Sequence, residues 1–184
     1  QNNKYAFFPS VGLGWMISNE DFLKDNSLIS KLKLHTSYGV TGNSEIGTYK
    51  SLATVSQSNT IIGDALHVVS YLDNMPNPDL KWEKNKTWNI GLDLSFIDRI
   101  SVTFDYYQRK TSDLIYDLPV SQVGGYYDGN YGYTTPQNIG SLKNSGFELT
   151  ITSTNFRNKD FTWTTSLNMA HNSNKLTKLD GQQN

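Results

Sequence analysis

The side chains best suited to molecular recognition in this sequence are tyrosines gathered in one glycine-rich stretch. The segment YYDGNYGY at 126–133 carries Tyr126, Tyr127, Tyr131 and Tyr133. A tyrosine ring can stack on a sugar ring or press against a protein surface while its hydroxyl forms a hydrogen bond. The stretch therefore predicts either a contact surface or, as the alternative, a turn whose tyrosines pack beneath their own loop.

Acidic and histidine side chains are also present, but their spacing matches no catalytic or metal-binding motif. The acids that invite an acid–base interpretation are Glu20, Asp21, Asp105, Asp113 and Asp117, and the histidines are His35, His67 and His171. Asp128-Gly129-Asn130 has a faint resemblance to a calcium loop but lacks the regular ligand spacing, which favours a plain turn. With no nucleophile elbow, phosphate loop or zinc motif, we expect no catalytic residue, no metal site and no cofactor. The acids are expected to cap turns and to line a cavity.

β-Strands must position these residues, because six stretches alternate apolar and polar side chains. In KTWNIGLDLSF the apolar positions fall on one parity and the polar positions on the other, as in a strand with two unlike faces. The six stretches are 7–16, 31–39, 86–96, 100–109, 145–152 and 161–171. Each has roughly the 9–11 residues that a tilted strand needs to cross a bilayer.

The expected connections alternate in length. Tight turns are expected at Ile97-Asp98-Arg99 and at 155–160, and a modest segment at 18–26, whereas two long loops are expected at about 40–85 and 110–143. Short turns on one side and long loops on the other are typical of outer-membrane barrels. Pro76 and Pro78 favour a rigid exit from the first long loop, because proline cannot donate to a strand ladder.

Composition leaves two all-β alternatives open, a soluble sandwich and a membrane barrel. The chain of 184 residues has 36% hydrophobic residues, and no apolar run is long enough for a transmembrane helix. A barrel tolerates this polarity because its lipid-facing residues occupy only alternate positions. The net charge of −1 predicts no nucleic-acid partner, and the absence of cysteine excludes disulfides and thiolate chemistry. The first residues, QNNKYAFFPS, do not resemble a signal peptide, so we expect a mature chain or an interior piece.

The two strand faces favour the barrel. The polar parity carries charged residues in mid-strand, which suits a water-filled interior, and the apolar parity carries aromatic residues near strand ends, where interfacial girdles lie. We expect 86–96 and 100–109 to form an antiparallel hairpin whose lipid-facing side chains are Trp88, Ile90, Leu92, Val102 and Phe104. The fold class predicted is thus all-β, an antiparallel transmembrane β-barrel segment of about six strands.

Several ordered motifs resemble those of the SusC/RagA-like TonB-linked outer-membrane transporters. They are SYGVTGN (37–43), NPDLKWEK (77–84), DYYQRKTSDL (105–114) and NIGSLKNSGFELTI (138–151), and the resemblance covers most of residues 7–180. It implies a barrel of about 22 strands filled by a plug domain. Residues 1–184 are expected to be part of that barrel domain, with the plug and the remaining strands absent from this sequence.

The resemblance also implies a function, which is active import of nutrients without enzymatic chemistry. The implied partners are a SusD-like surface lipoprotein that acts as a lid, the TonB complex acting through the plug, outer-membrane lipid, and a glycan or oligopeptide cargo. The implied location is the outer membrane of a Gram-negative bacterium, and the four tyrosines of 126–133 become candidates for contact with cargo or lid. A siderophore or vitamin receptor and a non-transporting adhesin or structural β-protein are the alternatives.

Overall fold

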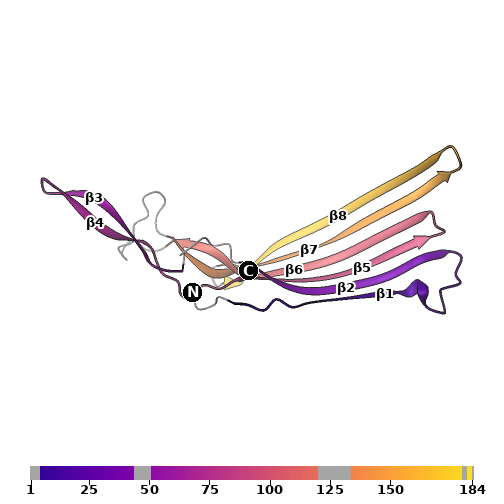
Figure 1. The fold of residues 1–184 in the computed structure, drawn as a ribbon, viewed down its shortest axis with the longest axis horizontal. Helices are drawn as coiled ribbons and strands as arrows, with labels where there is room; N and C mark the ends of the chain where they lie inside the picture. Colours follow the sequence, from indigo (N-terminus) through magenta and orange to yellow (C-terminus); the bar gives the residue numbers. More distant parts are fainter. Residues whose placement is uncertain (1–4, 44–50, 120–133, 180–181, 184) are drawn as a thin grey trace.

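Six long strands form a single antiparallel layer. The computed structural model describes residues 5–43, 51–119, 134–179 and 182–183 of the chain. The strands are β1 (Ser10–Met16), β2 (Ile29–Asn43), β5 (Glu83–Phe96), β6 (Ile100–Pro119), β7 (Thr134–Arg157) and β8 (Thr162–Leu179), and the two-residue β9 (Gln182–Gln183) pairs with the end of β8. The sheet order β1-β2-β5-β6-β7-β8-β9 follows the chain except for one excursion after β2 (Figure 1). The six predicted strands and their antiparallel arrangement are confirmed.

The register brings like residues together on each face of the sheet. Leu34, Leu92, Phe104, Leu149 and Met169 are successive partners from β2 to β8, so they form one apolar row. One residue along each strand, the partners are polar, as in the pair Asp93 and Thr103. Because side chains alternate between faces, the sheet has one apolar and one polar face. All five side chains predicted to face lipid lie on the apolar face, as the register Trp88↔Gln108 to Leu94↔Val102 requires.

No described element packs against the apolar face. Trp88, Ile90 and Phe104 remain 40%, 36% and 39% exposed, and Leu13 is 70% exposed. Among the described residues, Leu80 is the only fully buried large side chain, and it lies outside the strands. A soluble sandwich would bury its inner faces against a second sheet. The described residues supply no such second sheet.

The short connections lie together at one end of the sheet (Figure 1). They are the β1–β2 segment, which contains the 3-10 helix η1 (Ile17–Asn19), the turn between β5 and β6, and the turn between β7 and β8. Ile97 and Asp98 both have φ of 51°, a left-handed backbone conformation that residues other than glycine rarely adopt. Hydrogen bonds from Ile97 N to Leu28 O (2.7 Å) and from Asp98 N to Ser30 Oγ (3.2 Å) hold this turn against β2.

The expectation of two long loops was wrong in part, because both contain strands. Within 40–85, β3 (Thr54–Ile62) and β4 (Ala65–Asn74) form a separate two-stranded hairpin that projects away from the sheet at the end opposite the short turns (Figure 1). The turn is Gly63-Asp64, with Gly63 at φ 65°. Glycine at such a position avoids the steric cost of a positive φ. Sequence alternation in this hairpin is weak, and the described part of the chain places no second sheet on either of its faces.

Strands β6 and β7 also extend well beyond their predicted ends and pair up to Pro119↔Thr134. The register shifts at Asp113, where φ is 57°, so the regular two-residue period of the sequence is interrupted there. This bulge explains why the sequence pattern predicts a loop over 110–119 where the structure has a strand. The tyrosine-rich stretch at 126–133 and the turn at Asp128-Gly129-Asn130 lie outside the described residues. Within the described ranges, no helix has the length and apolar character needed to cross a membrane.

The segment before β5 is fastened to these extensions. The Asn138 side chain accepts a hydrogen bond from Lys81 N (2.8 Å) and donates to Lys81 O (3.0 Å) and Asp113 O (2.8 Å). Asn77 Nδ2 donates to Pro136 O at 2.8 Å. Leu80, in the same segment of the chain, is fully buried. Side-chain hydrogen bonds, rather than a strand ladder, thus hold the first part of the NPDLKWEK motif against β6 and β7.

Candidate functional site

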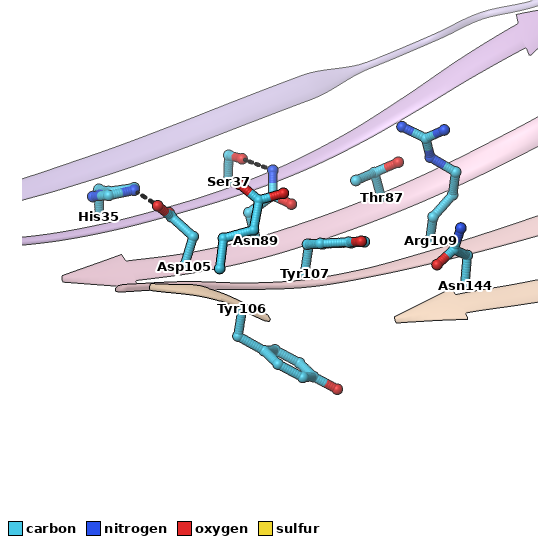
Figure 2. A pocket seen from close by; sticks show the side chains of 10 residues that line it. His35, Ser37, Thr87, Asn89, Asp105, Tyr106, Tyr107, Arg109 and Asn144 are labelled. Carbon is cyan, nitrogen blue, oxygen red and sulfur yellow. Dashed lines mark hydrogen bonds and ion pairs between the residues drawn. The ribbon is translucent and has the colours of Figure 1, made fainter. Parts of the chain in front are cut away.

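The polar face is organised in rows, and the central row holds a hydrogen-bonded pair of side chains. His35 of β2, Gly91 of β5, Asp105 of β6 and Glu148 of β7 are successive register partners. His35 Nε2 and Asp105 Oδ1 are hydrogen-bonded at 3.0 Å (Figure 2). Their side chains are 33% and 37% exposed, so the pair is half-buried. A Cβ on Gly91 would collide with both partners, so glycine leaves the space that their bond occupies.

Side chains of the next row, towards the long-connection end, also contact each other across strands. Asn89 Nδ2 donates to Ser37 Oγ at 3.0 Å across β5 and β2. Tyr107 of β6 lies over Gly146 of β7, where an added Cβ would come within 2.8 Å of the phenol oxygen. The absence of a side chain at Gly146 thus makes room for the tyrosine ring.

These rows surround a hollow of about 450 Å³ on the polar face. The charged groups that line it are Asp105, Glu148 and Arg109, and they come from β6 and β7. Figure 2 shows the Tyr106 ring directed away from the other labelled side chains, towards the apolar side. Two polar atoms of residues that line this hollow, His35 Nδ1 and Asn144 Oδ1, are buried and lack a hydrogen-bond partner among the described residues. The groups that a polar molecule in the hollow can reach are the more exposed Asp105, Glu148 and Arg109.

An ion pair lies on the same face nearer the short turns. Lys31 Nζ is 3.5 Å from Asp93 Oδ2, and Thr103 Oγ1 donates to Asp93 Oδ1 at 3.3 Å. The polar face therefore combines acids, cations and amides in mid-strand. Its chemistry is reversible hydrogen bonding and ion pairing with a hydrated partner.

The structure does not gather the candidate residues into one site. Tyr126, Tyr127, Tyr131 and Tyr133 lie outside the described residues, so their proposed contacts stay a prediction. Of the acids, Glu20 accepts a hydrogen bond from Trp15 Nε1 at 2.8 Å and Asp21 pairs with Lys24 at 2.6 Å, both beside the short connections. Of the five acids named from the sequence, only Asp105 lines the hollow, together with His35.

Sequence reasoning missed the His35–Asp105 pair. Both residues were assigned to the polar parity, but their meeting depends on the register of three strands. The useful signal is Gly91, because a glycine inside a strand often marks a close approach of neighbouring groups. The β3–β4 hairpin was missed too, although Gly63-Asp64 between two β-prone runs is a hairpin signal.

An open antiparallel layer with one apolar face, one charged face and all short turns at one end is the wall of a β-barrel. Residues 1–184 match the family model described as TonB dependent receptor-like, beta-barrel. This chain belongs to that family.

Curated relatives agree with the family assignment. The chain is 42% identical over 180 residues to the TonB-dependent receptor P3 of Formosa agariphila, covering 97% of this chain and 17% of the relative. It is 41% identical over 187 residues to the TonB-dependent receptor SusC of Bacteroides thetaiotaomicron, covering 98% of this chain and 18% of the relative. The chain therefore spans less than a fifth of the length of these receptors.

Solved structures show the same wall. The RagAB peptide importer matches in its closed-closed state with a TM-score of 0.81 and 37% sequence identity, over 97% of this chain and 19% of that one. Its open-open state matches with the same TM-score and identity. The chain is thus an antiparallel β-barrel segment of the SusC/RagA-like type.

Proposed function

We propose that this chain is one wall section of a TonB-dependent active importer in the outer membrane of a Gram-negative bacterium. The observation that carries the proposal is the contrast between the two uncovered faces of one sheet. The apolar face suits contact with lipid, and the polar face with its hollow of about 450 Å³ suits an aqueous lumen. Membership of the receptor family supports the same placement.

The complete importer would contain further strands and a plug domain in addition to this wall. The greater length of the relatives supports this, since the chain covers only 17% and 18% of two of them. In the complete protein the polar face would line the lumen, and energy would reach the plug from the TonB complex. The hollow around Asp105 would then face the plug or passing cargo.

Oligopeptides are the cargo class that we favour over glycans. The matching RagAB structures are of a peptide importer, and the hollow presents Arg109 together with Asp105 and Glu148. Peptides carry both signs of charge, whereas neutral glycans carry none. The test is uptake of labelled oligopeptides and oligosaccharides by cells that express the complete receptor, with and without TonB. We expect uptake of the oligopeptides but not of the oligosaccharides, and only in cells that have TonB. Uptake that persists without TonB contradicts active import.

The end of the wall that carries the long connections would be extracellular, because outer-membrane barrels keep their short turns on the periplasmic side. We place a SusD-like lipoprotein over this end. The β3–β4 hairpin supports this placement, since Val55, Ile61, Leu66 and Val68 are 64–72% exposed and lie on one of its faces. A two-stranded hairpin is marginally stable alone in water, so a protein partner would stabilise it.

Sidedness and partner contact can be tested separately on the hairpin. A cysteine at Asp64 should react with an impermeant reagent on intact cells, and reaction only after lysis contradicts the topology. Replacing Ile61 and Leu66 by serine should weaken co-purification of the lipoprotein. The control changes Asn59 and Gln57 to serine on the same face, and equal losses in both variants would contradict an apolar contact.

A further inference from the structure

The apolar face ends, near the long-connection end of the sheet, in a row of four lysines. Lys86 of β5 is the register partner of Lys110 of β6, Lys110 is the partner of Lys143 of β7, and Lys143 is the partner of Lys175 of β8. All four side chains are exposed. Neighbouring strands lie about 4.8 Å apart, so the row spans roughly 14 Å of the outer surface. We call these four residues the lysine row.

The lysine row lies on the outward face rather than in the lumen. Lys110 stands between Arg109 and Thr111, which belong to the polar face, where Arg109 pairs with Thr87. Lys143 likewise precedes Asn144, which lines the hollow. Since side chains alternate along a strand, the lysines share their face with Trp88, Tyr106 and Phe147.

The neighbouring rows set the depth of the lysine row. Going towards the long-connection end, the row Leu92–Phe104–Leu149–Met169 is followed by Ile90–Tyr106–Phe147–His171, then by Trp88–Gln108–Ser145–Ser173, and then by the lysine row. Each step advances by about 6.8 Å along the strands. Tryptophan and tyrosine favour the membrane interface. The lysines, one row further out, therefore lie at the level of lipid head groups.

The row carries uncompensated positive charge. No ion pair or hydrogen bond joins these four ammonium groups to another described residue. The outward positions from Lys84 to Phe96, Ile100 to Ser112, Ser141 to Ser153 and Thr165 to Lys175 are all described and include no aspartate or glutamate. Like charges directly opposite each other on adjacent strands are destabilising. Four in succession therefore repel one another unless an external anion neutralises them.

We propose that the lysine row is a binding site for the phosphate groups of anionic lipids in the leaflet at the long-connection end. Lysine is a common phosphate ligand that acts as a point charge. Trp88 lies one row nearer the middle of the apolar face, and Tyr106 and Phe147 lie two rows nearer. These rings contact the acyl part of the same lipid, so head group and chain are recognised together. The proposal rests on the membrane placement in the proposed function, and it adds a lipid site on the outer wall.

The test is a titration of the complete receptor in neutral detergent with phosphatidylglycerol, followed by native mass spectrometry. The variant K110Q/K143Q should bind phosphatidylglycerol roughly 30-fold more weakly, because each lysine near an anionic lipid surface contributes about a factor of 5. The variant K110R/K143R should keep the affinity. Phosphatidylcholine should bind all variants equally.

The matched control is K24Q/K159Q, which removes two charges at the short-turn end. An equal loss of affinity in the control overturns the proposal, because it would reflect net charge alone. Displacement of phosphatidylglycerol by equimolar inorganic phosphate also overturns it, because it indicates a free-anion site. Loss of a co-purifying acidic protein with unchanged lipid affinity overturns it in favour of a protein interface.

Folding and membrane placement are checked independently of lipid affinity. Retained heat-modifiability on gels shows that K110Q/K143Q is folded. If the double variant does not fold, the single variants Lys110→Gln and Lys143→Gln are titrated instead, and each should weaken lipid binding roughly 5-fold. A fluorophore attached to a cysteine placed at Leu92, tested with membrane-embedded quenchers, reports on the membrane placement. Quenching at Leu92 with unchanged phosphatidylglycerol affinity would overturn the lipid site alone.

Discussion

His35 Nε2 and Asp105 Oδ1 meet at 3.0 Å above the strand that separates them. His35 belongs to β2 and Asp105 to β6, and both are register partners of Gly91 on β5. Their backbones are separated by two strand spacings, or about 9.6 Å. The bond therefore links three strands through side chains, in addition to the backbone ladders, and it depends on the missing side chain at Gly91.

Gly91→Ala should disrupt this link and destabilise the wall. The new methyl group would collide with the ends of both side chains, His35 and Asp105. The two side chains must move apart, so their hydrogen bond is lost, at a cost of about 1 kcal/mol. The measurement is denaturant unfolding of the complete receptor in detergent, followed by tryptophan fluorescence. Gly12→Ala is the control, since its methyl would meet only ordinary contacts at 3.8 Å.

A double variant sharpens this prediction. Adding His35→Ala to Gly91→Ala removes one of the two colliding groups, so the combined loss should be smaller than the sum of the single losses. Strict additivity would show that the clash does not involve the His35–Asp105 pair.

Leu92→Arg should weaken the barrel strongly. Leu92 lies in the middle of the apolar face, and an arginine on the lipid side near the bilayer midplane costs about 2–4 kcal/mol. Thr103→Arg is the matched control, because Thr103 lies on the polar face beside Asp93. The readout is the unfolding free energy in lipid vesicles. Comparable effects of the two substitutions would argue against a lipid-facing Leu92.

Asn138→Ala should release the segment before β5 without unfolding the sheet. The change removes the hydrogen bonds to Lys81 N, Lys81 O and Asp113 O, each worth about 1 kcal/mol. Hydrogen exchange should accelerate at residues 77–82 and stay constant in β5. Gln137→Ala serves as the control, and identical exchange in both variants would show that Asn138 does not hold the segment.

The isolated chain of 184 residues should not form a stable soluble monomer. β1 is the edge strand on one side of the sheet, and β8 has only the two residues of β9 as a further partner. Exposed edges and an uncovered apolar face favour aggregation. Analytical ultracentrifugation with thermal melting in detergent-free buffer is the measurement. A monomer that melts cooperatively would refute the membrane interpretation.

Much of the fold is encoded in local sequence patterns. Trp88, Ile90 and Leu92 alternate with polar residues because lipid and water act on opposite faces of β5, so the strands, their faces and the short turns could be predicted. The pattern fades in β3 and β4, which form a separate hairpin outside the main sheet. It is also broken at Asp113, where the bulge shifts the register.

The candidate site was less accessible to sequence reasoning. The parity of His35 and Asp105 follows from local alternation, but their pairing depends on the register across β5, which no single strand encodes. The lysine row illustrates the same point, since Lys86 and Lys175 are far apart in sequence and become members of one row only through the ladders between them. The strand register thus brings residues that are distant in sequence together on one surface of the sheet.

The central claim, that this sheet separates lipid from an aqueous lumen, is tested most directly by spin labels at successive positions of β6. Single cysteines at Ser101, Val102, Thr103 and Phe104 in the reconstituted receptor are labelled, and collisions with oxygen and with a water-soluble nickel chelate are measured. We predict that oxygen accessibility is high at Val102 and Phe104, and that nickel accessibility is high at Ser101 and Thr103. Equal access of the nickel chelate to all four positions would contradict the claim.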